Sequence, residues 1–149
     1  MKKSILLTAL GICMSMSVMA QEFKVITIVE SIVPAGLGRS RIVETTGDAN
    51  IDSLTTQREG DLSKSKDVKR GDLKDIGDNL KETKLLNFYS IGGINFGNIA
   101  SNDAIISAKI NEMTRLGWKV AYITSGVESD GGKEDGNGIF ITRIFLTKG

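Results

Sequence analysis

The sequence predicts an α+β protein, with an antiparallel sheet of four to five strands and one main helix packed on one face. Two observations predict this class. Segments rich in Val, Ile and Thr lie at 23–33 and 139–148, and such segments are typical of strands. Apolar residues recur at helical spacing between 105 and 116, which indicates one amphipathic helix. A chain of 149 residues is typical of a single domain.

The composition excludes several classes of functional site. The chain has no histidine, one cysteine and a formal net charge of +1. Without histidine there is no Ser-His-Asp triad, no histidine general base and no histidine metal ligand. The balanced charge argues against a nucleic-acid partner that is held through phosphate contacts. We expect no nucleic-acid partner, and no motif in the sequence indicates a cofactor.

Residues 1–20 have the pattern of a cleaved secretory signal. Lys2 and Lys3 precede an apolar stretch, which ends in small residues at Ala20. The stretch is shorter than the roughly 20 apolar residues that a membrane-spanning helix needs. We expect cleavage between Ala20 and Gln21 and an exported protein, periplasmic or extracellular, that has no membrane span after cleavage.

Two alternatives to simple cleavage stay open: an uncleaved N-terminal anchor, and lipoprotein processing at Cys13. Ile12 is bulky at the position where lipoprotein processing prefers a small residue. Cleavage after Ala20 leaves 129 residues without cysteine, with 17 basic and 18 acidic side chains. Such a chain has no disulfides and depends on a packed core for its stability.

The first half of the chain after residue 20 predicts a β-hairpin followed by a polar insertion. Pro34 and two glycines follow the first strand and supply turn chemistry, so 23–45 reads as a hairpin. In 46–84, 17 of 39 residues are charged and none is aromatic. We expect a polar, mobile insertion there, with one weak helix at 72–82, inside a single domain spanning 21–149.

The second half predicts a strand at 85–91, a loop at 92–98 and then the main helix. Ser101, Asn102 and Asp103 are candidate N-caps, and Gly117 ends the helix. Five residues form its apolar arc: Ile105, Ile106, Ile110, Met113 and Leu116. Lys109 projects inside that arc, with its stem on the core and its ammonium expected in water.

Two strands, at 118–125 and 139–148, complete the predicted sheet. Ile139, Ile141 and Phe145 lie on one face of the last strand, and Arg143 interrupts that face. The other face holds Phe140, Ile144 and Leu146. One helix covers only one side of a sheet, so something else must cover the second apolar face. Residues 85–100 and a second copy of the protein are both open possibilities.

The segment 109–148 resembles a small uncharacterised bacterial family whose short domain has a strand, a helix ending in Gly-Trp and two antiparallel strands. The likeness is carried by Ile110-Asn111-Glu112, by Leu116-Gly117-Trp118 and by the last strand with Arg143. The long insertion before the helix departs from that pattern. The chain after residue 20 also resembles secreted hypothetical proteins of the same length. These resemblances imply the fold and bring no assigned activity, ligand or catalytic residue.

Candidate site residues come from three local patterns. Arg39 and Arg41 share one face of a predicted strand, where two guanidinium groups can hold a carboxylate or sulfate. Tyr89, Gly92 and Gly93 precede the helix, where glycines can cradle a phosphate on backbone amides. A glycine-rich loop offers weak calcium candidates, which are Glu128, Asp130 and Asp135. For each pattern a purely structural explanation, such as a turn or a solvated loop, stays open.

The pattern as a whole favours a small exported binding or interaction module without catalysis. We expect a homodimer or a protein partner at the apolar sheet face. The alternative is a small hydrolase that uses carboxylates without His or Cys. A cleft holding two carboxylates with raised pKa values would favour the hydrolase, and a broad apolar patch would favour the module.

Overall fold

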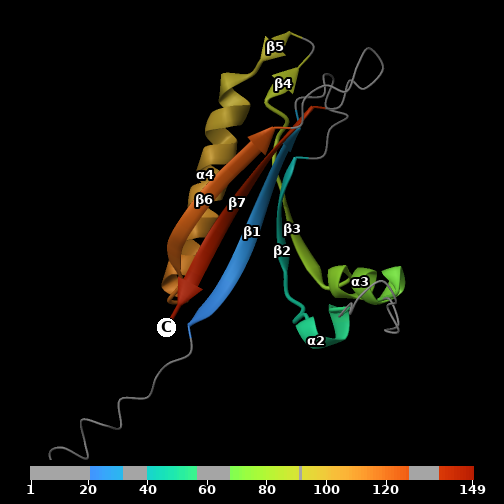
Figure 1. The fold of residues 1–149 in the computed structure, drawn as a ribbon. Coiled ribbons are helices and arrows are strands. Elements are labelled where there is room, and N and C mark those ends of the chain that lie inside the picture. Colours follow the sequence, from blue (N-terminus) through green and yellow to red (C-terminus); the bar gives the residue numbers. More distant parts are fainter. Residues whose placement is uncertain (1–20, 32–39, 57–67, 91, 128–137) are drawn as a thin grey trace, which may run out of the picture.

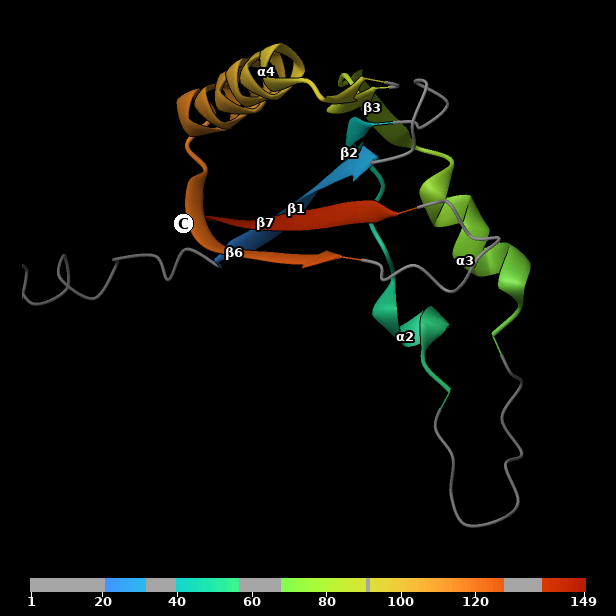
Figure 2. The same cartoon turned by 90° about the horizontal axis from the view of Figure 1, so that it is seen from above.

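The fold is α+β, as the sequence predicts, with a five-stranded antiparallel sheet and one long helix on one face (Figures 1 and 2). The computed structural model describes residues 21–31, 40–56, 68–90, 92–127 and 138–149. The strand order is β3-β2-β1-β7-β6. The sheet strands are β1 (Glu22–Ser31), β2 (Arg41–Thr45), β3 (Leu80–Lys84), β6 (Lys119–Val127) and β7 (Ile139–Lys148). The other elements are α2 (Ile51–Leu54), α3 (Arg70–Gly77), β4 (Tyr89–Ser90), β5 (Gly93–Ile94) and α4 (Phe96–Arg115).

The first and last strands of the chain form the centre of the sheet. β1 and β7 pair along ten residues, from Glu22 opposite Lys148 to Ser31 opposite Ile139. β2 flanks β1, which confirms the predicted hairpin, and its connecting residues 32–39 lie outside the described part. Because side chains alternate along a strand, each central strand sends every second residue toward α4. The ends of the described chain thus meet in one ladder.

The hydrophobic core lies between the sheet and α4. Among the described residues it consists of seven buried side chains: Ile26, Ile28, Ile42, Leu85, Met113, Ile144 and Leu146. Ile105, Ile106 and Ile110 pack against this cluster from α4, as the helical spacing predicts. Leu116, the fifth residue of the predicted arc, is instead exposed, and it is the C-cap residue, one position past the end of the helix.

Helix α4 is longer at its N-terminus than the sequence suggests. It begins at Phe96, and Asn95 is its N-cap, whose side chain accepts a hydrogen bond from the backbone N–H of Asn98 at 3.1 Å. The expected N-caps at 101–103 lie inside the helix, so that prediction is wrong. Gly117 ends the helix as predicted, with a φ of +88° that favours glycine.

The residue expected as a possible cap, Asn102, is instead a buried contact between α4 and the segment before it. Its side-chain amide accepts from the N–H of Leu86 at 2.8 Å and donates to the carbonyl of Leu86 at 2.7 Å. Ser40 holds the same segment from the β2 side, through the N–H of Leu85 and the side chain of Asn87. Because these bonds satisfy the backbone here, residues 85–88 add no strand to the main sheet.

Of the strand predicted at 85–91, only Tyr89–Ser90 is observed as a strand, β4, and it pairs with β5 outside the main sheet. The fifth strand of the main sheet comes from the charged region instead. β3 pairs with β2 from Arg41 opposite Lys84 to Thr45 opposite Leu80. The helix expected at 72–82 is α3, which ends at Gly77, so that Leu80 begins β3. Neither α2 nor α3 has a buried residue, and both lie beyond the lower ends of β2 and β3 (Figure 1).

The predicted signal segment, residues 1–20, lies outside the described part of the chain. Among the residues that the structure does describe, no helix has both the length and the apolar character needed to cross a membrane. Export and its compartment therefore stay predictions from the sequence.

Candidate functional site

The candidate site is the face of the sheet that α4 does not cover, which we call the open face. The register defines it, because residues paired across antiparallel strands point to the same side. Glu82, Val43, Thr27, Arg143 and Thr124 form one row across all five strands. Lys84, Arg41, Val29, Ile141 and Gly126 form the next row, and Val25, Phe145 and Tyr122 lie on the other side of the first row.

The centre of the open face is apolar and half-exposed. Val25, Val29, Val43, Ile141 and Phe145 are each partly exposed, although they lie on interior strands. Phe23 and Tyr122 at the margins are 68% and 64% exposed. Tyr122 packs against Phe145 with ring centroids 6.1 Å apart. An apolar face of this kind is unusual on an isolated soluble domain and is typical of an interaction surface.

Residues 85–100, the internal cover that the sequence left open, lie on the α4 side instead. Leu85 belongs to the core with Met113, and Phe88 contacts Phe140, with ring centroids 5.8 Å apart. Phe140 alternates with Arg143 and Phe145 along β7 and faces α4. Within the described residues, therefore, this segment does not cover the open face.

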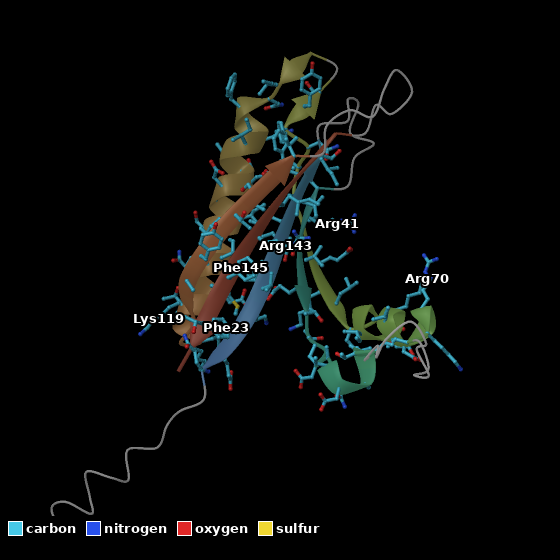
Figure 3. The ribbon with its side chains drawn as sticks, in the orientation of Figure 1. Phe23, Arg41, Arg70, Lys119, Arg143 and Phe145 are labelled. Atoms are coloured by element: carbon cyan, nitrogen blue, oxygen red, sulfur yellow. The ribbon has the colours of Figure 1, made fainter. Side chains whose placement is uncertain are left out.

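Arg143 is an exposed cation at the centre of this apolar surface (Figure 3). Its neighbours in the row are Thr27 on β1 and Thr124 on β6, and Ile141 and Phe145 flank it along β7. Among the described residues it makes no ion pair. An exposed guanidinium with five donors and apolar surroundings can receive a carboxylate in a bidentate pair.

A shallow hollow lies beside Arg143, where β6 ends and β7 begins. Its volume is about 390 Å³, and its lining is Gly126, Val127, Ile139, Ile141 and Arg143. Gly126 contributes to the hollow because it has no side chain, and no described atom lies within 4 Å of a Cβ built there. The hollow can therefore accept an apolar side chain from outside.

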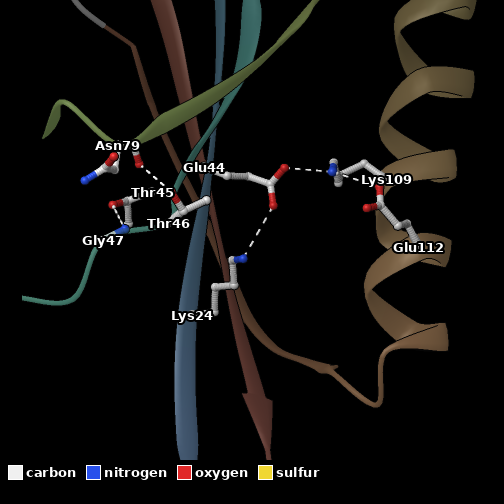
Figure 4. A network of polar contacts seen from close by, with 8 residues as sticks. All are labelled: Lys24, Glu44, Thr45, Thr46, Gly47, Asn79, Lys109 and Glu112. Atoms are coloured by element: carbon white, nitrogen blue, oxygen red, sulfur yellow. Dashed lines mark hydrogen bonds and ion pairs between the residues drawn. The ribbon is translucent and has the colours of Figure 1, made fainter.

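On the opposite side of the sheet a network of four charges joins α4 to β1 and β2 (Figure 4). Glu44 is buried, and its carboxylate lies 2.7 Å from Lys109 Nζ and 3.6 Å from Lys24 Nζ. Lys109 also donates to Glu112 at 2.8 Å. The ammonium expected in water is thus bound to a buried carboxylate, so that expectation is wrong.

The network changes the protonation of its members in opposite directions. Burial acts to lower the pKa of Lys109, but hydrogen bonds and charges from Glu112 and Glu44 outweigh it, so the pKa is raised. The hydrogen bond from Lys109, together with its positive charge, lowers the pKa of Glu112. A lowered pKa is opposite to what a general acid needs at neutral pH. These groups hold the helix on the sheet.

A second pocket of about 570 Å³ lies at the end of the sheet near the start of β1. Trp118 and Phe23 line it together with two acidic residues, Glu22 and Asp48. Both acidic residues are exposed, and Lys24 lines the same pocket. The described residues contain no group of three or more Asp, Glu, His or Cys that could hold a metal ion.

The residues selected from the sequence as ligand candidates do not converge in the structure. Arg41 lies on the open face and forms an ion pair with Glu82 on β3. Tyr89, Gly92 and Gly93 belong to the small β4–β5 sheet and its turn, beyond the N-terminus of α4 (Figure 1). Arg39 falls outside the described residues. The calcium candidates Glu128, Asp130 and Asp135 do too.

The sequence shows that Arg143 interrupts an apolar face of the last strand, but it does not assign Arg143 to a site. The alternation of Ile139, Ile141, Arg143 and Phe145 on one face was the available signal. The importance of Arg143 follows only from the structure, in which no described element covers this face.

Comparisons with protein-family models, with curated proteins and with solved structures found no match.

Proposed function

We propose that the protein is a small exported interaction module without catalysis, whose open face binds a partner protein that presents a carboxylate among apolar side chains. One observation carries the proposal: the exposed Arg143, without an ion pair among the described residues, stands in the middle of an apolar sheet face. The apolar neighbours exclude water from the pair and thereby strengthen it.

The shape of the surface favours a protein over a small molecule. Small ligands bind in concave pockets that enclose most of their surface. The open face instead spreads side chains of β1, β2, β7 and β6 over a sheet, with one shallow hollow beside Arg143. A protein can cover such a face with several apolar residues and one acidic residue, which gives both affinity and orientation.

The first test uses anilinonaphthalene sulfonate, a probe that combines an aromatic system with one negative charge. We expect the native protein to bind it and to enhance its fluorescence. Arg143→Gln should weaken this binding by roughly tenfold, the effect of losing one charge-assisted contact. Arg70→Gln, which removes the same charge from α3 outside the open face, should leave it unchanged.

The second test locates the partner in the producing cell. A photo-crosslinking residue at Thr27, on the open face, should form an adduct of discrete size with another protein. The same residue at Ser107, an exposed position on α4, serves as the matched control. Arg143→Glu should abolish the Thr27 adduct through charge repulsion. Equal labelling from both positions, or labelling unaffected by Arg143→Glu, would contradict the proposal.

A further inference from the structure

The edge strand β6 is exposed along its whole length. In the described part of the chain it pairs only with β7, so roughly half of its backbone N–H and C=O groups point outward with no strand beside them. Four large apolar side chains on it are each more than 40% exposed: Val120, Tyr122, Ile123 and Val127. Residues 120–127 include no charged residue and no proline.

The opposite edge of the same sheet, β3, is protected against pairing with another chain by charged residues. β3 carries Lys81, Glu82 and Lys84 within five residues, and charges on an edge strand oppose pairing with another chain. β6 has one irregularity, a register shift between Val120 and Tyr122, which leaves Tyr122–Val127 as a regular stretch. One edge is therefore blocked, whereas the other presents six uncharged residues in regular β geometry.

We propose that β6 is a dimer interface, at which β6 of a second copy pairs antiparallel to it about a two-fold axis at Thr124. A second copy fits this edge because the regular stretch Tyr122–Val127 carries no charge, so two copies of it do not repel each other. A two-fold axis perpendicular to the sheet also keeps paired residues on the same face, as antiparallel pairing requires.

The register follows from the side chains of the open face. With Thr124 on the axis, Tyr122 lies opposite Gly126 of the partner subunit, and this contact occurs twice. Tyr122 is 64% exposed, and no described atom lies within 4 Å of a Cβ built on Gly126. An aromatic ring across from a strand glycine covers the exposed backbone there. The two Thr124 side chains meet on the axis, and threonine pairs are favourable in this position.

Registers shifted by one residue lack this fit. An axis at Ser125 brings together two hydroxyls that are already engaged, since Ser125 Oγ is 2.8 Å from Thr142 Oγ1. An axis at Ile123 places Tyr122 opposite Thr124. Gly126 then lies opposite Val120, on the far side of the register shift and outside the regular stretch. The axis at Thr124 is therefore the one that uses both the exposed ring and the empty glycine position.

The dimer does not depend on the proposed function, but it would place the open faces of the two copies next to each other. Because the axis is perpendicular to the sheet, both open faces lie on one side and both copies of α4 on the other. Loss of partner binding through Arg143 would leave the β6 pairing intact. Conversely, a failure of β6 pairing would leave the single open face available.

Cysteine crosslinking of the protein expressed from the full sequence tests the pairing. Directly opposed antiparallel residues have Cβ atoms about 4.5–5.5 Å apart, within reach of a disulfide after small adjustment. Thr124→Cys should give a covalent dimer on mild oxidation. Tyr122→Cys should give it only when mixed with Gly126→Cys. The wild type, with Cys13 alone, and Thr114→Cys on α4 are the controls.

Sedimentation supplies the second readout. The wild type should be dimeric at micromolar concentration, and Thr124→Lys should raise its dissociation constant by roughly tenfold or more, because two lysines then meet on the axis. A mixture of Thr124→Lys and Thr124→Glu should form a heterodimer. A wild-type monomer at concentrations up to about 100 μM would overturn the proposal. So would a dimer that Thr124→Cys does not crosslink, as expected if the open faces stacked on each other instead.

Discussion

Glu44 places a carboxylate under α4, where only 5% of the residue is exposed. Its charge is tolerated because Lys109 and Lys24 both contact it, from the helix and from β1. Removal of one partner from a buried ion pair leaves an uncompensated charge, which costs more than the pair itself contributes. The network therefore makes the docking of α4 sensitive to single substitutions.

The substitution Lys109→Met tests this sensitivity. It keeps the apolar stem on the core and removes the ammonium from Glu44, so we expect the free energy of unfolding to fall by roughly 2 kcal/mol or more. Lys24 remains near Glu44 and limits the loss. Urea denaturation measures it. Glu112→Gln removes only the exposed partner and should cost clearly less, so an equal loss for both variants would contradict this account.

The same network predicts how stability depends on pH. The pKa of Lys109 is raised, so its contribution is fully present below its unfolded value of 10.5 and is lost as pH rises through the folded pKa. The pKa of Glu112 is lowered, so its contribution is present above 4.5 and is lost as pH falls through the folded pKa. Denaturation midpoints should therefore decline at both extremes. In Lys109→Met both declines should be smaller than in the wild type.

At the scale of elements, local signals were sufficient where one segment determines its own structure. The branched residues of β1 and β7 and the glycine at position 117 predicted their elements correctly. Local signals predicted the wrong structure where contacts with a distant segment of the chain determine it. The sequence of β3, LKETK, is charged and becomes a strand because β2 offers it a ladder. Asn102 has the chemistry of a cap, but Leu86 occupies its amide in the interior.

The candidate site was predictable only in part, for the same reason. Alternation along β7 showed that Arg143 shares a face with Ile141 and Phe145. That no described element covers this face depends on the position of residues 85–100, and buried polar contacts of Asn102 and Ser40 determine that position. Such contacts join residues far apart in sequence, and no periodicity reveals them.

The C-terminus of α4 gives a prediction at this scale. Gly117 has a positive φ, and the N–H groups of Gly117 and Trp118 donate to the carbonyls of Thr114 and Met113. Gly117→Ala should lower the free energy of unfolding by about 1–2 kcal/mol, the cost of a left-handed conformation with a Cβ. Gly71→Ala in α3 is the control, because its site has open space, and should be neutral or slightly stabilising. Equal effects would exclude a special role for Gly117.

For the whole molecule, the two edges of the sheet should behave differently. Both β3 and β6 border on solvent in the described structure, but β3 carries three charges within five residues, whereas β6 is uncharged from Val120 to Val127. If β6 pairs with its own copy, its outward amides are bonded in the dimer and free in the monomer. Hydrogen exchange at these amides then depends on protein concentration, whereas exchange in β3 does not.

We therefore expect the amides of Tyr122–Val127 that point away from β7 to exchange more slowly as concentration rises. At a total concentration ten times the dissociation constant, about one fifth of the chains are monomeric, so exchange should slow by about fivefold. Amides of β3 should exchange at the same rate throughout, and Thr124→Lys should remove the concentration dependence in β6. Slowing of equal size at both edges would indicate general association of the protein, because specific pairing protects β6 alone.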